Sequence, residues 1–514
     1  MGIQRGSRQA VKRSEPRQRR RAFLAGLGGL LACGALVGVT RRVSGGRVPA
    51  SIVTAVPGGT MAPGSPTVAV ASANRDDIDT ATPSDWAWRD LGAAAPARVG
   101  ADTADMAAFT PLIGMARVVG VGEATHGTSE FFGLRQRLLA YLGRERGFTD
   151  LAIEADWSAT AALDAWVQGG SGEPRALLAA LDAWFYDTGE MLDILVWLRA
   201  YNAATPDPAA RLRLHGLDVQ RPDGAISAVL DYGTVVGPPL AARLAMLYAS
   251  FCSYVAPPAN LAGPDRYRYA GATAATRAQC RADLRAAVAE LEARREHVAP
   301  GDPALALERA IRAARIVAQA EEYLSFGAGF FDESNAARDR ALAENALWAL
   351  DQAGPRGRLV VWAHNAHVGT FGREPAGAQA FLRLGDHLRA TLGAQYVALA
   401  LSAGAGGFNA IAPTAGAGGF AAPTAHTLSP PPPDSYDALL AGGPSPTFLL
   451  DLRPPAGELA GGSRPVAPRR FREIGTIYNP SLPELAYVTI HLARVFDGVC
   501  QIQHTTPSVL LPAR

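Results

Sequence analysis

The 514-residue sequence predicts an α/β fold, with a mixed or mainly parallel sheet flanked by helices and a large helical insertion. Two observations favour this class. Short apolar runs alternate with longer segments of helical periodicity, the pattern of strands joined by crossover helices. A long stretch of helical pattern, at about residues 226–350, separates the early strand-like runs from the late ones. Because 48% of the residues are apolar, the chain can bury a large core.

Composition divides the chain into three expected segments. Residues 1–40 are predicted to be an export signal or membrane anchor. Residues 41–83 are rich in Gly, Pro, Ser and Ala without periodicity, which is typical of a flexible tether. Residues 84–514 are expected to form the folded domain, with a mainly helical insertion at about 157–350.

The first segment has the order of an export signal. Three arginines, Arg19 to Arg21, precede an apolar run at 22–39, and paired arginines before Phe23-Leu24 resemble the twin-arginine class. A run of about 18 residues is at the lower limit for crossing a bilayer, so an anchor that keeps the protein at the membrane is the second choice. The segment therefore predicts a bacterial protein that is secreted or membrane-anchored outside the cytoplasm.

Charge is unevenly placed along the chain. Residues 1–50 hold 11 of the 49 basic residues and one of the 47 acidic ones, which leaves a net charge of −8 on the remainder. Nucleic-acid binding needs a basic face, so no nucleic-acid partner is expected. Four cysteines are too few for a disulfide scaffold. Cys252 and Cys280 could bridge two helices or lie buried and unpaired.

The expected elements follow the chain in order. Strands are predicted at residues 117–122, 150–153, 211–214, 359–363, 396–401, 447–450 and 473–478. Helices are predicted at 129–146, within 158–202, and as an antiparallel pair at 274–299 and 303–324. Two copies of Gly-Ala-Gly-Gly-Phe, followed by four prolines, predict a long flexible loop over one face at 404–434.

Polar side chains gather where four of these strands end. The four clusters are Glu123 with His126, Glu154 with Asp156, His215 with Asp218, and His364 with His367. One strand-end histidine is more often a structural hydrogen bonder than a catalyst. Since ligand crevices lie beyond the carboxyl ends of strands in open α/β sheets, four such clusters together favour one shared site.

These residue types suit the hydrolysis of a carbonyl compound. An imidazole titrates near neutral pH and can take a proton from water, and a nearby carboxylate can orient it. Arg135, on the first helix, could balance developing negative charge. The sequence has no GxSxG, Walker, GxGxxG or HExxH motif, which argues against a serine nucleophile and against nucleotide binding.

The sequence resembles the erythromycin esterases over about residues 85–500. The resemblance rests on segments at 122–127, 130–135, 153–156, 188–191, 197–199, 215–218, 335–345 around Arg338-Asp339, 362–367, and more weakly 472–478. It implies a hydrolase that opens a carboxylic ester, such as a macrocyclic lactone, with an activated water. It implies His126 as general base, with the neighbours Glu123, Glu154, Arg135 and His364. His367, Asp218 and Asp156 are then expected to contact a small-molecule ester or lactone, and no cofactor is expected.

Two other hypotheses stay open at this stage. The same Glu and His cluster could hold a divalent metal such as zinc, which would lower the pKa of a bound water in a metal-dependent hydrolase. Alternatively, the crevice could belong to an exported protein that binds a ligand or a metal without catalysis. The full charged set favours an enzyme, while the sequence makes no prediction of its oligomeric state.

Overall fold

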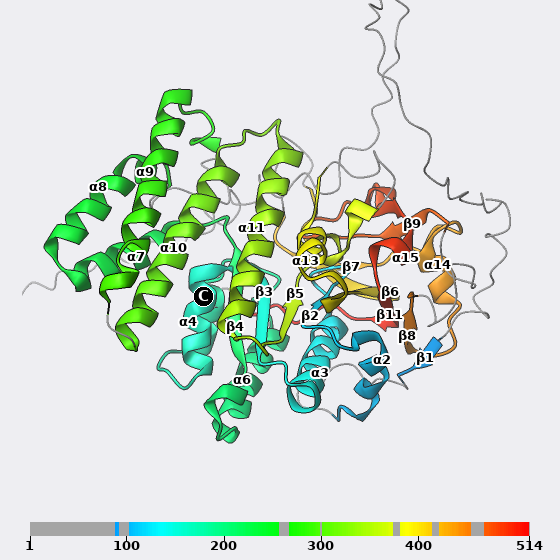
Figure 1. The fold of residues 1–514 in the computed structure, drawn as a ribbon. Coiled ribbons are helices and arrows are strands. Elements are labelled where there is room, and N and C mark those ends of the chain that lie inside the picture. The colour runs from blue at the N-terminus through cyan, green and yellow to red at the C-terminus, as the bar shows by residue number, and fades with distance from the viewer. Residues whose placement is uncertain are drawn as a thin grey trace, which may run out of the picture.

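The computed structural model describes residues 88–91, 102–255, 267–298, 301–373, 381–413, 421–453 and 467–512. The predicted signal at 1–40 and the tether at 41–83 lie outside these ranges. A nine-stranded mixed sheet forms the centre of the molecule, with helices packed against it (Figure 1), which confirms the predicted α/β class. None of the described helices has the length and apolar character that a membrane span requires.

The strands run in the order β1-β8-β11-β6-β2-β5-β3-β4, and β7 pairs with β6. Their bounds are β1 Trp88–Asp90, β2 Val118–Val121, β3 Asp150–Asp156, β4 Arg213–Asp218, β5 Leu359–Trp362, β6 Tyr396–Ala410, β7 Thr424–Thr427, β8 Thr447–Asp451 and β11 Gly498–Thr505. The six strands from β11 to β4 are mutually parallel, whereas β1, β7 and β8 pair antiparallel. A separate antiparallel pair joins β9 (Arg469–Arg472) to β10 (Tyr487–Ile490).

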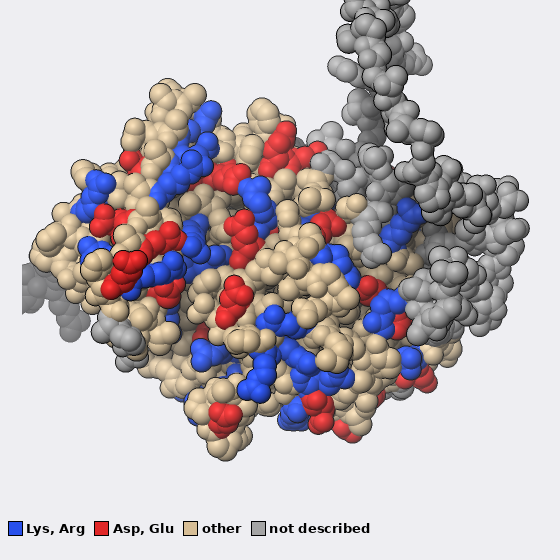
Figure 2. All heavy atoms as spheres, viewed as in Figure 1, with Lys and Arg blue, Asp and Glu red and all other residues tan. Residues whose placement is uncertain are grey.

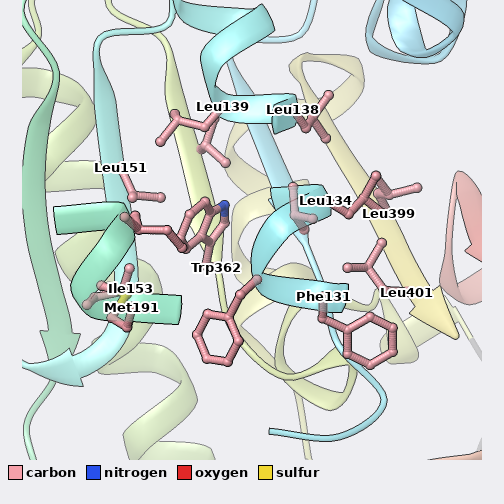
Figure 3. Packing of buried hydrophobic residues seen from close by; sticks show 14 of the residues in the cluster. Phe131, Leu134, Leu138, Leu139, Leu151, Ile153, Met191, Trp362, Leu399 and Leu401 are labelled. Atoms are coloured by element: carbon pink, nitrogen blue, oxygen red, sulfur yellow. The ribbon is translucent and has the colours of Figure 1, made fainter. Parts of the chain in front are cut away.

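The central strands are apolar because both faces of the sheet are covered. In β2, Val119 and Val121 belong to one hydrophobic core and Val118 to the other. Figure 3 shows the first core, where Phe131 and Leu134 of α3 (Ser129–Arg146) lie near Leu399, Leu401 and Trp362. The α3 helix has the bounds predicted for it, and its leucines are buried as expected.

The remaining helices surround the sheet or form the insertion. After β3 and before β4 lie α4 (Trp157–Val167), α5 (Pro174–Ala179) and α6 (Gly189–Ala204). The insertion between β4 and β5 comprises α7 (Asp223–Val236), α8 (Pro238–Val255), α9 (Ala274–Glu292), α10 (Asp302–Leu324) and α11 (Phe331–Gln352). Shorter helices are α2 (Thr110–Ile113), α12 (Asn365–Val368), α13 (Leu384–Leu392), α14 (Tyr436–Ala441) and α15 (Leu492–Val495). Because β4 belongs to the main sheet, the uninterrupted helical segment begins at α7 rather than near residue 157.

The insertion has a hydrophobic core of its own, formed mainly by α7 to α10. On its surface, Arg295 pairs with Glu308, Arg315 with Glu292, and Arg340 with Glu322. Figure 2 shows charges of both signs spread over this face of the molecule. Exposed pairs contribute about 0–1 kcal/mol each, so buried apolar packing stabilises the insertion. The α11 helix links it to the sheet, since α11 contacts α10 as well as β3 and β4.

The structure corrects several boundaries. The strand predicted at 473–478 is wrong: the strand there is β9, and beyond it Ile474 and Ile477 form only isolated bridges, to Thr125 and Ile411. The predicted loop also begins too early, because β6 continues to Ala410 and pairs with β11 and β7. Glycine allows this continuation at Gly406, where φ is +109°. The second Gly-Ala-Gly-Gly-Phe copy lies outside the described residues.

Three cysteines lie in the described ranges, and all of them are free. Cys280 is buried against Ser250, with 3.2 Å between Sγ and Oγ, and Cys252 is half-buried. The alternative of a bridge between Cys252 and Cys280 is therefore not what the structure has.

Candidate active site

The loop after β2 carries a histidine held by a carboxylate. His126 Nδ1 lies 2.7 Å from Glu123 Oε1, and Arg135 Nη1 donates to Glu123 Oε2 at 2.6 Å. Arg135 is 1% exposed and also donates to the carbonyls of Val121 and Ala363, at 3.0 and 2.8 Å. The carboxylate is therefore fixed from both sides, and its arginine joins the ends of two neighbouring strands.

The loop after β5 approaches this loop closely. The Asn365 N–H donates to the Glu123 carbonyl at 3.0 Å, and the Asn365 side chain bonds Leu401 of β6. A Cβ atom on Gly122 would lie 2.0 Å from Asn365 Oδ1, so only glycine fits there. This contact places His364 beside His126, with 5.0 Å between the ring centroids.

The Nε2 nitrogen of His126 is available to act as a base. The ring stacks on Phe185, with centroids 4.4 Å apart, and its Nε2 makes no hydrogen bond to any residue that the structure describes. Because Nδ1 faces the Glu123 carboxylate, the neutral ring places its proton on Nδ1 and a lone pair on Nε2. That lone pair can accept a proton from a water molecule.

A second polar group centres on Arg338 of α11. Its Nη2 donates to Asp218 Oδ2 at 2.6 Å and to Glu154 Oε1 at 2.8 Å. The other Glu154 oxygen accepts the backbone N–H of His364 at 2.9 Å. Burial raises the pKa of both carboxyl groups, but nearby positive charge outweighs it: Arg338 lowers the pKa of Asp218, and His367 with Arg338 holds that of Glu154 well below its usual value.

His367 lies between two carboxylates. Its Nδ1 is 2.6 Å from Asp339 Oδ1, and its Nε2 is 3.2 Å from Glu154 Oε1. Burial lowers the pKa of this histidine, but the charges of Asp339 and Glu154 prevail and raise it to about 10. His367 is therefore a cation at neutral pH. Its 3.1 Å contact with Arg338 Nη1 then joins two donors, so it is not a hydrogen bond.

His364 differs from His367 in charge. Burial and the neighbouring His126 lower its pKa to about 3, although Glu154 opposes the shift. Its Nε2 lies 3.1 Å from the carbonyl oxygen of Ile474. His364 is therefore neutral, with the proton on Nε2.

The structure brings most of the predicted site residues together: Glu123, His126, Arg135, Glu154, Asp218, His364 and His367. Two residues from the same clusters have other contacts. Asp156 caps α4 by accepting the Ala159 N–H at 2.7 Å, and burial raises its pKa to about 6. His215 lies within β4, because that strand runs to Asp218 and not to 214, and it bonds Asp150 at the start of β3.

Comparisons with known proteins show which family the chain resembles. A sequence model of the family described as "Erythromycin esterase" matches residues 144–505, well over half of the chain. The chain belongs to the erythromycin esterase family. This membership makes the protein a hydrolase of that family. Glu154, Asp218, Arg338, His364 and His367 lie inside the matched range, whereas Glu123, His126 and Arg135 precede it.

Relatives of this erythromycin esterase family member have low identity but long coverage. Erythromycin esterase type II of Escherichia coli is 23% identical over 421 residues, which are 78% of this chain and 93% of that protein. A crystal structure of a Bacillus cereus protein is 26% identical, with a TM-score of 0.67 over 81% of this chain and 96% of that one. A mutant of the erythromycin esterase EreC in its open conformation shares the fold, with 17% identity, a TM-score of 0.61 and coverage of 80% and 96%.

Three charged residues beside the predicted site residues are not predicted from the sequence to belong to the site: Arg338, Asp339 and Glu473. All three lie in segments that carry the resemblance to the erythromycin esterase family, yet no local pattern predicts their burial. Arg338 and Asp339 are buried on α11, and the side chain of Glu473 is 7% exposed. The contact of α11 with the strand ends reveals the part of Arg338 and Asp339 in the site, and the contact of Glu473 with His364 reveals that of the segment after β9.

The same side chains bear on the metal hypothesis. Among the described residues, no three or more His, Cys, Asp or Glu side chains are arranged to hold a metal ion. The imidazoles and carboxylates bond instead to one another and to Arg135 and Arg338. A metal that used these carboxylates would compete with Arg135 for Glu123 and with Arg338 for Glu154.

Proposed function

We propose that this erythromycin esterase family member hydrolyses a carboxylic ester, such as a macrolactone, by attack of a water that His126 activates. One observation carries the proposal. The Arg135–Glu123–His126 series orients the imidazole through Nδ1 and leaves Nε2 without a partner among the described residues. This is the arrangement of a general base held by a carboxylate.

In the proposed reaction, His126 takes one proton from water and later gives it to the leaving alcohol. Nε2 of His126 takes a proton from water as the water oxygen attacks the ester carbonyl carbon, which gives a tetrahedral intermediate. When the carbon–oxygen bond to the leaving alcohol breaks, the His126 imidazolium returns the proton to the leaving oxygen. The products are a carboxylic acid and an alcohol, or one hydroxy acid from a lactone, and His126 is neutral again.

The carboxylate beside His126 favours the protonated imidazole. Glu123 Oε1 lies 2.7 Å from Nδ1 of His126. It stabilises the imidazolium that forms when Nε2 takes a proton from water, as the carboxylate partner of a catalytic histidine does.

We further propose that the enzyme works outside the cytoplasm on a small molecule. The support is the arginine-rich leader with its apolar run at 22–39, which resembles a twin-arginine signal. Macrolide antibiotics are the first substrates to test, because the E. coli relative is named an erythromycin esterase. Their hydrolysis would make the protein an antibiotic-resistance factor.

The test is a panel of lactones and esters, including erythromycin, incubated with the purified protein and analysed by mass spectrometry. The expected result is a product heavier than its substrate by one water, formed by the wild type and not by His126→Ala. Binding of a panel member without any mass change would favour a ligand-binding protein over an enzyme. Undiminished turnover by His126→Ala would exclude His126 as the base.

A further inference from the structure

The segment after β11, residues 506–511, lies beside the loop of the proposed base. The Ser508 N–H donates to the Gly127 carbonyl at 3.0 Å, and the Ser129 N–H donates to the Thr506 carbonyl at 3.0 Å. Both bonds join main-chain groups, so they fix the backbone of the loop. The 506–511 segment therefore holds the chain directly after the base.

The fit is closest at Gly127, the residue after His126. Its carbonyl also accepts the Asn409 N–H at 2.9 Å, and a Cβ atom on Gly127 would lie 2.2 Å from the Asn409 carbonyl oxygen. Only glycine fits so close to another backbone. The Asn409 side chain in turn donates to Ser508 Oγ at 3.1 Å. The backbone beside the base is thus enclosed between β6 and the 506–511 segment.

The 506–511 segment continues to the loop that carries Phe185. The Gly189 N–H donates to the Val509 carbonyl at 2.8 Å, and the Leu511 N–H donates to the Asp187 carbonyl at 3.0 Å. The Phe185 ring stacks on the imidazole of the base, with centroids 4.4 Å apart and an angle of 22° between the planes. One short segment therefore binds the loops of both stacked rings.

Two glutamates anchor this segment, each from the first turn of a helix. Glu130 of α3 accepts the N–H and the hydroxyl of Thr506, both at 2.8 Å. Glu190 of α6 accepts the Val509 N–H at 3.0 and 3.1 Å from its two oxygens. Both glutamates lie in segments that carry the family resemblance, and the proposed reaction gives neither of them a role. Because Thr506 and Val509 are exposed, their N–H groups can bond water when an anchor is removed.

The orientation of the base depends on more than its carboxylate partner. The bond from Nδ1 to Glu123 fixes one edge of the imidazole and leaves the tilt of the ring open. The stacked Phe185 ring fixes that tilt, and with it the direction in which Nε2 points. An error of about 1 Å in the position of a reacting group can cost about 100-fold in rate.

We propose that the 506–511 segment is a positioning element that keeps Phe185 stacked on His126, with Glu130 and Glu190 as its anchors. Its catalytic meaning rests on the proposed function. The segment supplies no group to the reaction. It acts by holding the two loops in register, so that Nε2 of the base faces the water that it activates.

The test follows the Cε1–H signal of His126 in carbon-13 histidine-labelled protein without substrate, recorded for the neutral ring and assigned with His126→Gln. The ring current of a stacked phenyl group shifts this signal, so Phe185→Leu reports its position without the stack. Glu190→Ala, which changes neither ring, should move the signal toward that position. Asp193→Ala, at an exposed site on the same helix, is the matched control and should leave it in place. Glu190→Gln keeps an oxygen that accepts the Val509 N–H, so it should keep the wild-type signal.

A second variant tests the other anchor. Thr506→Val removes the hydroxyl bond to Glu130 at an exposed position and should displace the His126 signal in the same direction as Glu190→Ala. A wild-type signal in both Glu190→Ala and Thr506→Val would overturn the proposal. The same displacement in Asp193→Ala as in Glu190→Ala would overturn it as well.

Kinetics then test the catalytic consequence on any ester that the enzyme turns over. Glu190→Ala should lower kcat by about 10- to 100-fold with KM unchanged, because a misdirected base affects the reacting geometry and not the binding of substrate. Glu190→Gln should restore kcat. A raised KM with unchanged kcat in Glu190→Ala would refute the positioning role. The spectra require no turnover, so they distinguish a failure of this inference from a failure of the proposed esterase activity.

Discussion

Arg338 of helix α11 donates a 2.8 Å hydrogen bond to Glu154 at the end of strand β3, 184 residues earlier in the chain. The same guanidinium bonds Asp218 of β4. One buried arginine therefore connects the helical insertion to two neighbouring strand ends. Two ionised carboxylates depend on it for their charge balance.

Removal of this arginine should destabilise the protein strongly. Arg338→Met leaves Glu154 and Asp218 buried without their main donor, and a broken buried ion pair costs about 3–5 kcal/mol. The matched control is Arg340→Met, two residues along the same helix, whose partner Glu322 is 46% exposed. That change should cost about 0–1 kcal/mol. Urea unfolding measures both, and equal effects would show that the Arg338 network does not stabilise the fold.

Substitution of the proposed base should abolish activity and leave the fold intact. His126→Ala should lower kcat by about 10²–10⁴-fold, the usual contribution of a general base. Because His126 is buried against Phe185 and bonds Glu123 through Nδ1, the variant should also lose about 1–3 kcal/mol of stability. His215→Ala is the control, because His215 bonds Asp150 in the same way at the other end of the parallel strands. It should lose a similar amount of stability and keep kcat, and an equal loss of kcat in the two variants would remove His126 from the mechanism.

The sequence predicts those parts of the fold that are local. The sequence alone shows the wholly apolar runs of strands β2 and β5 and the leucine spacing of α3. It also shows the polar residues that follow the strands. The sequence does not predict strand β11, because Gln501, Gln503 and His504 interrupt its apolar pattern. In the structure, β11 lies between β6 and β8. Its polarity is tolerated only in the tertiary context that the sheet supplies.

The site shows the same limit. Glu123 and His126 are three residues apart, and Arg135 follows on the next helix, so local reasoning finds all three. Arg338 and Glu473 reach the site from a long helix and from an irregular segment, and charged residues in such places are more often solvent-exposed. Only tertiary packing shows that they are buried beside Glu154 and His364.

Stability should fall as the pH rises from about 6.5 to about 10, through the titration of His367. Its pKa is about 10 in the folded protein and 6.5 in the unfolded chain, so between these values the folded state binds more protons. The contribution is complete below pH 6.5 and is lost as the pH approaches 10. The slope should be on the order of 1 kcal/mol per pH unit. Denaturation of wild type and His367→Asn across this range measures it.

His367→Asn should lack this change of stability with pH between about 6.5 and about 10, although its overall stability will be lower. His387→Asn, the same exchange on α13 outside the Arg338 network, should keep the wild-type slope. Parallel stability curves for wild type and His367→Asn would mean that His367 is neutral in the folded protein. The carboxylates Asp339 and Glu154 would then not hold a proton on it.

Metal removal should leave activity unchanged. The candidate ligands bond to one another and to two arginines, an arrangement that supplies a general base without a cation. Dialysis against EDTA should therefore preserve turnover, and elemental analysis of the purified protein should find less than one equivalent of any divalent metal. Loss of activity in EDTA that zinc restores would favour the metal-dependent hydrolase instead.

Gly122→Ala should separate the two loops that carry the histidines. The added Cβ would lie 2.0 Å from Asn365 Oδ1, and this residue holds the loop of His364 through bonds to Glu123 and Leu401. Forced overpacking costs about 1–3 kcal/mol, and the displacement of His364 should also lower kcat. Gly475→Ala is the matched control, since nothing lies within 4 Å of its Cβ, and it should change stability by less than about 0.5 kcal/mol. Thermal unfolding and ester turnover of both variants decide the matter: if Gly122→Ala behaves like Gly475→Ala, close contact of the two loops is not required for the site.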